Sequence, residues 1–251
     1  MSKNILDLEE IVLRWAWDSY NTTAQKAKLK YENALFDIHW DKVKCVPKKP
    51  EFIPSGPGQR QPQSRTIFKS IFKNESPTEQ THLLKVERQT TSTCTSSVTK
   101  GYTKGINIGL TLASPLDIAE LAVGFEKGFS VENAEESTDE KSLTWATEGN
   151  LVVQPNKSLT AELQIKEEQQ SFNFKTSVGI SGRIMVAILN RKENSNLVMT
   201  VENYIDEVIP AYTSAQRVRK NGRVVYIDMA GSCQFKFGIQ QEIKCSQCNN
   251  Y

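Results

Sequence analysis

The chain has 251 residues and a formal net charge of only +2, so bulk electrostatics give no reason to expect a nucleic acid as its partner. This length allows one elongated all-β unit or two smaller domains with a sizeable buried core. No apolar run approaches the roughly 20 residues that a membrane-spanning helix needs. The acidic first residues lack the pattern of a secretory signal, so the protein stays inside the cell, leaves it by another route, or is in its mature form.

Two helices are predicted in the N-terminal part. Apolar residues recur at helical spacing over residues 5–20, with Asn4 as the expected cap. A second apolar stripe predicts that this helix is packed on two sides within its own protein. The alternative is that its aromatic residues form a patch for a receptor, and the candidates are Trp15, Trp17 and Tyr20. A second helix is expected from Thr23 to about Leu35.

A long polar ribbon is predicted after an irregular connection. Residues 46–64 hold five prolines and two glycines, which exclude a long regular element, and a short strand follows at residues 66–73. Residues 90–99 are almost all hydroxyl-bearing or small, so they favour an extended chain but supply little hydrophobic area. We expect this strand to pair with residues 135–147 in a twisted ribbon that is solvated on both faces.

An amphipathic stretch, residues 101–134, lies between the two polar strands. Apolar residues occupy even positions in its first half and odd positions in its second half, and this two-residue period is typical of strands. The pattern predicts a hairpin of two strands in which Leu112 faces Leu121. Each strand has an apolar face and a polar face, so the hairpin either covers a soluble core or forms one unit of a membrane barrel.

The remaining third of the chain is predicted to be β-structure. A strand, a tight turn at residues 154–157 and a second strand are expected between Asn150 and Ile165. A further strand pair is expected over residues 172–188, with Gly179 and Gly182 as bulges. A turn at Asn221-Gly222 leads into the final strands.

The sequence contains no recognisable catalytic motif, so we expect no enzyme activity and no catalytic residues. The signatures of serine hydrolases, phosphate-binding loops, zinc proteases and dinucleotide-binding turns are all missing. His39 and His82 are the only histidines, and an ordinary structural role is the favoured interpretation of both. The five cysteines do not form a disulfide pattern. For the terminal pair, Cys245 and Cys248, a frayed tail is favoured over half of a zinc site, so no metal and no cofactor are expected.

The order of these segments resembles a known family. The segments that carry the resemblance are NESPTEQTHLLKVERQTTSTCTSSVTKG from Asn74, the amphipathic hairpin, the Ser/Thr/Glu-rich return strand, VVQPNKSLTAELQI and NGRVVYIDMAGSCQFKF. From about Asp37 to near its end, the chain is similar to the aerolysin-like β-pore-forming toxins of the epsilon-toxin/mosquitocidal-toxin branch. The resemblance implies a mainly β, elongated aerolysin-like fold of long twisted antiparallel strands, with an N-terminal helical segment and a tucked hairpin.

The resemblance also implies a division of labour along the chain. Residues 1–73 correspond to a helical, receptor-binding head, residues 74–185 to a pore-forming module and residues 186–251 to C-terminal β-sandwich strands. The implied partners are a lipid, glycan or protein receptor on a target-cell membrane and further copies of the chain, usually seven. The protein is then secreted or released without a recognisable signal peptide and acts at the target-cell membrane.

In that mechanism one hairpin from each copy enters a transmembrane barrel. Side chains alternate between the two faces of a strand, so the hairpin residues divide into a membrane-facing set and a lumen-facing set, with a tip between the two strands. The membrane-facing set is Ile106, Ile108, Leu110, Leu112, Leu121, Val123, Phe125, Phe129 and Val131. The tip is formed by Pro115, Leu116, Asp117 and Ile118. The lumen-facing set is Asn107, Thr111, Glu126 and Glu132, whose two carboxylates favour cations.

Two lysines interrupt the apolar pattern of the hairpin. Lys104 and Lys127 fall on the apolar faces of the hairpin, where they set the upper edge of the lipid-facing band.

One alternative to a pore-forming toxin is a non-lytic protein of the same fold that binds membranes or glycans. The other is a soluble β-sandwich interaction protein whose hairpin only covers the core.

Overall fold

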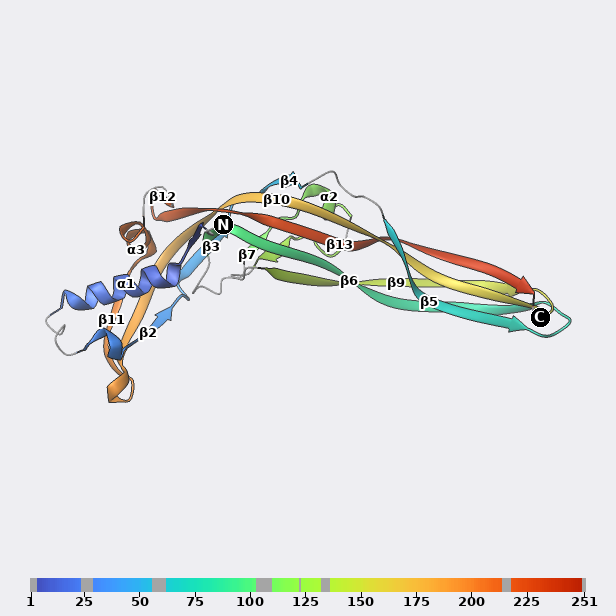
Figure 1. Cartoon of the computed structure of the whole chain (residues 1–251), viewed down its shortest axis with the longest axis horizontal. Helices are drawn as coiled ribbons and strands as arrows, with labels where there is room; N and C mark the ends of the chain where they lie inside the picture. The colour runs from blue at the N-terminus through green and yellow to red at the C-terminus, as the bar shows by residue number, and fades with distance from the viewer. Residues whose placement is uncertain are drawn as a thin grey trace.

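The computed structural model describes residues 4–23, 29–55, 62–102, 110–121, 123–131, 136–213 and 218–249. The molecule is long and narrow, with helices α1 and α3 at one end and a tail of strands that ends beside the C-terminus at the other (Figure 1). The helices are α1 (Leu8–Asn21), α2 (Leu116–Ala119) and α3 (Ile205–Ala211). The strands are β1 (Asn4–Leu6), β2 (Ala34–His39), β3 (Val43–Pro47), β4 (Glu51–Pro54), β5 (Gln63–Asn74), β6 (Gln80–Tyr102), β7 (Leu110–Leu112), β8 (Phe129–Val131), β9 (Ser137–Val153), β10 (Lys157–Asn190), β11 (Asn196–Tyr204), β12 (Val218–Asn221) and β13 (Val224–Asn249).

Two long strands run through the molecule and connect its ends. β10 has 34 residues and β13 has 26, and they pair antiparallel from Lys157 opposite Asn249 to Ile180 opposite Val225. The expected strand pair over residues 172–188 is wrong, because this segment is the uninterrupted second half of β10. The final strands are likewise one strand, which the predicted turn at Gly222 connects to β12.

The C-terminal cysteines lie in β13 rather than in a frayed tail. Cys245 is paired with Ala161 and Cys248 with Ser158 of β10, and both thiols are exposed and free. The expectation of a frayed tail is therefore wrong, because β10 extends to the end of the molecule and supplies a pairing partner. No group of three possible metal ligands occurs among the residues that the structure describes.

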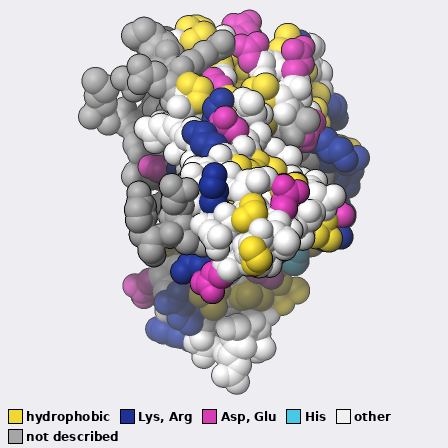
Figure 2. Space-filling view, turned by 90° about the vertical axis from the view of Figure 1, so that its right-hand side faces the viewer, with side chains coloured by type: hydrophobic (Ala, Val, Ile, Leu, Met, Phe, Trp, Pro, Cys, Tyr) yellow, Lys and Arg dark blue, Asp and Glu magenta, His cyan; other side chains and the backbone are white. Residues whose placement is uncertain are grey.

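The tail is a sandwich of two layers. β5 and β13 flank β10 in one layer, and β6 pairs with β9 in the other. A small core between the layers is formed by Leu84, Val86, Ala161 and Leu163. The turn expected at residues 154–157 connects the layers, with the Lys157 N–H donating to the Gln154 carbonyl at 3.3 Å. The end of this tail shows apolar side chains scattered among charged ones rather than gathered in one patch (Figure 2).

The head contains the helix expected near the N-terminus. α1 spans Leu8–Asn21, and Asp7 rather than Asn4 caps it, because the Asp7 carboxylate accepts from the Glu10 N–H at 2.9 Å. The second expected helix is wrong over its described part. Tyr31–Asn33 form a single 3-10 turn and Ala34–His39 form strand β2, while residues 24–28 lie outside the described residues. Pairing with the end of β10 overrides the local helical pattern in this segment.

β10 bends at Gly182, where it leaves one sheet and enters the other. On one side of this residue it pairs with β3, and on the other side with β2 and β11. Gly182 has a φ of +111°, and a side chain there would clash with the backbone carbonyl of Lys42. Gly179, the other expected bulge, pairs regularly with Tyr226 and Val46. Of these two glycines, only Gly182 therefore needs the conformational freedom of glycine.

We expect Gly182→Ala to lower the free energy of unfolding by at least about 2 kcal/mol, because a side chain is forced into a left-handed backbone beside Lys42. Urea unfolding followed by intrinsic fluorescence measures this loss. Gly149→Ala is the matched control, since no heavy atom lies within 4 Å of the position of its added Cβ. A Gly182→Ala variant as stable as this control would contradict the importance of the bend.

Candidate functional site

The amphipathic stretch is folded against the middle of the molecule. Its described part contains only short strands, β7 and β8, with α2 between them. Leu110 faces Val131 and Leu112 faces Phe129, so the register differs from the expected one with Leu112 opposite Leu121. Residues 123–128 form turns rather than the expected strand. In this conformation the hairpin is therefore a short ladder with a long, partly helical tip.

The predicted membrane-facing residues of the described hairpin are almost all hidden from water. Their exposed fractions are at most 2 % for the set Leu110, Leu112, Val123, Phe125, Phe129 and Val131. Leu121 is the exception at 43 %. Ile106 and Ile108 lie outside the described residues. At the tip, Pro115 and Ile118 are buried, whereas Leu116 and Asp117 are exposed.

Two phenylalanines anchor the hairpin on the long strands. Phe125 and Phe129 meet Phe235 of β13 edge-on, with ring centroids 5.5 and 5.4 Å apart. Phe129 also approaches Phe174 of β10 and Phe52 of β4, each at 6.4 Å. Aromatic pairs in this geometry contribute about 0.5–1.5 kcal/mol beyond their buried area. The cluster therefore joins the hairpin to three separate strands of the body.

Polar contacts add to this anchor. The Asp139 carboxylate of β9 accepts from the Ser130 N–H at 2.8 Å and pairs with the Lys141 ammonium at 3.0 Å. Within the hairpin, the Ser114 hydroxyl donates to the Phe125 carbonyl at 2.7 Å. An added Cβ at Gly124 would lie 2.6 Å from the Lys141 Cβ, so the hairpin backbone lies directly against that side chain. β9 thus holds the hairpin through Asp139 and Lys141, which the sequence pattern did not indicate.

The polar strand beneath this region is buried on one face. The pairing of residues 90–99 with the return strand is confirmed, with Thr90 opposite Leu143 and Ser96 opposite Ser137. The expectation of two solvated faces is wrong, because alternate residues Ser92, Cys94, Ser96 and Val98 are at most 3 % exposed. The structure buries these small side chains because larger apolar ones, including those of the hairpin, belong to the same core cluster.

Two free thiols lie on this buried face. Cys94 faces Phe235 across the ladder between β6 and β13, and Cys233 faces Phe172 across the ladder between β13 and β10. Burial raises the pKa of Cys233 to about 12 and raises the pKa of Cys94 further, with Cys233 and Asp139 adding smaller electrostatic contributions at Cys94. Both thiols are therefore held protonated and unreactive in this conformation.

Of the predicted lumen-facing residues, the structure describes Thr111 and Glu126, and both are exposed. The Glu126 carboxylate accepts from the Gly124 N–H at 3.0 Å, and this bond is the main cause of its lowered pKa. Asn107 and Glu132 lie outside the described residues, as does Lys104. Lys127 is exposed beside the buried Phe129.

The receptor candidates on α1 are mainly core residues. Tyr20 is fully buried and Trp15 is 8 % exposed, which matches packing within the protein. Trp17 is half-buried and stacks on Tyr20, with Tyr31 edge-on to it at 5.1 Å. Tyr31 is 57 % exposed, so Trp17 and Tyr31 are the aromatic pair that the head presents to solvent. Tyr31 was missed because the sequence pattern assigned it to a helix.

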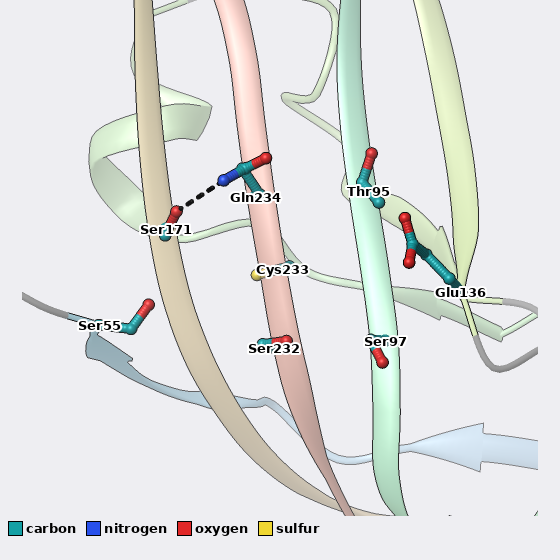
Figure 3. Close-up of a pocket in the computed structure, with 8 residues that line it drawn as sticks. All are labelled: Ser55, Thr95, Ser97, Glu136, Ser171, Ser232, Cys233 and Gln234. Carbon is teal, nitrogen blue, oxygen red and sulfur yellow. Dashed lines mark hydrogen bonds between the residues drawn. The ribbon is translucent and has the colours of Figure 1, made fainter.

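A shallow hollow of about 310 Å³ lies across the neighbouring strands on the outer face (Figure 3). Its polar lining comes from β6, β10, β13 and adjoining segments, and consists of Ser55, Thr95, Ser97, Glu136, Ser171, Ser232 and Gln234, with Cys233 behind them. Gln234 donates to the Ser171 hydroxyl at 3.3 Å. The lining residues include no aromatic ring on which a sugar could stack. The hollow is therefore an open, polar surface feature rather than a formed small-molecule site.

The histidines occupy unrelated positions. His39 is half-exposed with its Nε2 3.4 Å from the Asp37 carboxylate, and His82 lies in the tail beside the ring of Phe72.

No helix in the described part of the chain is long and apolar enough to cross a membrane.

Comparison with known proteins supports the fold. No family model matches the sequence, and no curated protein matches it. A non-toxic crystal protein from Bacillus thuringiensis has a TM-score of 0.52 at 14 % identity, over 98 % of this chain and 98 % of that one. The parasporin-2 toxin of Bacillus thuringiensis, which recognises cancer cells, has a TM-score of 0.43 at 12 % identity, over 86 % and 76 %. The Mpp75Aa1.1 β-pore-forming protein from Brevibacillus laterosporus has 0.41 at 12 %, over 98 % and 97 %.

At these identities the likeness concerns the fold alone. The chain has the mainly β, elongated aerolysin-like fold that the sequence predicts, with long antiparallel strands and an N-terminal helix.

We expect Phe129→Ala to loosen the hairpin, because truncating a fully buried phenylalanine costs about 3–5 kcal/mol. Hydrogen exchange measured by mass spectrometry will show faster exchange over residues 110–131 while β10 and β13 stay protected. Leu116→Ala is the control within the same segment, because Leu116 is 68 % exposed. Equal exchange in the two variants would contradict the anchoring role of Phe129.

Proposed function

We propose that this protein is a pore-forming cytolysin, not an enzyme, that binds a target-cell membrane, assembles into a ring of identical copies and inserts one hairpin from each copy. The observation that carries the proposal is an amphipathic hairpin whose apolar residues are stowed against the body and whose flanking strands are polar. Burying six such side chains is worth about 9–18 kcal/mol, taken at about 1.5–3 kcal/mol each. Water opposes their release, whereas the hydrocarbon of a membrane accepts them.

In the proposed pore, alternate hairpin residues face lipid and the others face the lumen. The lipid-facing set consists of the nine residues that the sequence predicts to face the membrane, and residues 115–118 enter first. A closed barrel leaves no unpaired strand edge in the hydrocarbon, which is why several copies are needed. Residues 1–73, apart from β5 in the tail, supply the receptor-binding head, residues 74–185 the pore module and residues 186–251 the remaining sandwich strands. The receptor is a lipid, glycan or protein, the assembly is heptameric, and the protein acts after release from its producing cell.

A disulfide that holds the stowed hairpin tests this function. Thr111 and Ser130 face each other across β7 and β8, at the short Cα separation that a cross-strand disulfide tolerates. We expect Thr111→Cys/Ser130→Cys, in a Cys245→Ser/Cys248→Ser background, to bind susceptible cells when oxidised but to release no dye. A reductant should restore dye release and SDS-resistant oligomers to the level of the background protein.

The background protein, treated with the same oxidant and reductant, is the control. Dye release from the oxidised double variant would show that lysis does not require β7 and β8 to separate, so that either the hairpin inserts in its stowed register or another element forms the pore. Binding without lysis by the background protein itself would favour the non-lytic alternative. A hairpin that stays protected on membranes, with no oligomers, would favour a soluble interaction protein.

The buried thiols provide a second test of the same function. In the Cys245→Ser/Cys248→Ser protein, we expect a maleimide to react slowly with all three remaining thiols in solution, because Cys94 and Cys233 are buried, Cys45 is partly buried, and burial raises the pKa of each. Addition of susceptible membranes should speed labelling of Cys94 and Cys233 at least about tenfold, since release of the hairpin uncovers their face. Cys45, whose pKa burial raises to about 12, lies in β3 and serves as the internal control. Unchanged labelling of Cys94 would contradict hairpin release.

A further inference from the structure

The ladder between β6 and β9 has one unbroken register. The residue numbers of every facing pair add up to 233, from Gln80 opposite Val153 to Ser96 opposite Ser137. In the stowed hairpin the numbers add up to 241, because Leu110 faces Val131 and Leu112 faces Phe129. The two ladders are therefore eight residues out of step, and the stowed hairpin is not a continuation of the ribbon that leads into it.

The chain lengths on the two sides allow the ribbon to continue in its own register. Ser96 and Leu112 are 16 positions apart, and so are Leu121 and Ser137. Extending the β6–β9 register without a bulge therefore places Leu112 opposite Leu121, which is the register that the apolar pattern predicts. The registers of the two ladders differ by eight residues, which is an even number, so every side chain stays on the same face of the ribbon in either register. An odd difference would pair residues from opposite faces.

β1 occupies the edge of β6 along which the extended ladder would form. Lys100 of β6 pairs with Asn4 on one edge and Ala230 on the other. Ser96 pairs with Ser137 of β9 on one edge and with β13 on the other. β1 therefore occupies the same edge of β6 as β9 does, directly beyond the end of β9. Extension of the ladder requires β1 to leave this edge.

The two faces of the extended ribbon carry opposite charge. Among the described residues, the face opposite the apolar set carries five carboxylates, Glu87, Glu126, Glu136, Glu140 and Glu148, and one cation, Lys85, a balance of −4. The face continuous with the apolar set carries four cations, Arg88, Lys100, Lys127 and Lys141, and one carboxylate, Asp139, a balance of +3. Lys85 pairs with Glu148 at 3.5 Å, so the one cation of the first face among the described residues is already engaged by one of the five carboxylates.

We propose that the inserted stem continues the β6–β9 register, with Leu112 opposite Leu121, and that the acidic face lines a cation-conducting lumen. This inference rests on the proposed pore-forming function. Apolar side chains face lipid, so the opposite face of the same ribbon faces the lumen along its whole length. In a ring of identical copies each glutamate becomes a ring of carboxylates, which attracts cations and repels anions. The four carboxylates are already exposed at Glu87, Glu136, Glu140 and Glu126, so their replacement leaves the core untouched.

Ion selectivity in a planar bilayer tests the acidic face. We expect a permeability ratio of potassium to chloride above about 3 for the unmodified protein, falling toward about 1 in Glu87→Gln/Glu136→Gln/Glu140→Gln. Glu51→Gln is the matched control, because Glu51 is exposed on β4, outside the ribbon, and its loss should leave the ratio unchanged. Anion selectivity, or a ratio unaffected by the triple substitution, would overturn the assignment of the lumen face.

Cross-linking tests the register separately. In the Cys245→Ser/Cys248→Ser background, Leu112→Cys/Leu121→Cys should cross-link under oxidation only after insertion. Thr111→Cys/Ser130→Cys should cross-link only before it. Persistence of the second cross-link in conducting pores would overturn the register. If the background protein forms no conductance and no oligomers, pore formation itself is wrong, which is a different result from a pore with another register or selectivity.

Discussion

The packing of Phe125 and Phe129 against Phe235 is the interaction on which the rest of this structure depends. It places an amphipathic hairpin over a strand too rich in serine and threonine to build a core alone. Water opposes their separation, because the hairpin would expose its apolar side chains and β6 would expose Cys94 and Val98, which belong to the same core cluster. The middle of the molecule is therefore a core to which the hairpin contributes many of the apolar side chains.

Two further restraints act on the same ribbon from different directions. Asp139 and Lys141 hold the hairpin from the side of β9, and β1 occupies the edge of β6 beyond the end of β9. The two ends of the molecule are connected without these restraints, because β10 and β13 pair along their length from the tail to Ile180, close to the bend at Gly182. The fold thus combines a continuous scaffold of two strands with a ribbon whose ladder is interrupted in the middle, so a change in the ribbon need not disturb the scaffold.

Much of the organisation was predictable from local pattern. Hydroxyl-rich composition predicted the polar strand that is found paired with the return strand, and turn residues predicted the turns at residues 154–157 and at Gly222, because both signals act over a few positions. The prediction of a second helix was wrong because Ala34–His39 pair with the edge of β10. The prediction that the polar strand is solvated on both faces was wrong because the hairpin and the long strands pack with one face of β6 in the same core cluster. The polar partners Asp139 and Lys141 carry no local signal at all.

The sequence by itself determined which hairpin residues share a face, since two-residue alternation is a property of the backbone in any register. It also contained the spacing that brings Leu112 opposite Leu121. Only the tertiary structure decided that Leu112 faces Phe129 here, because the aromatic cluster and the Asp139 contact stabilise a compact tip over an extended ladder. Local pattern specifies the faces of a strand, whereas the choice between two registers with the same faces depends on contacts with residues distant in the chain.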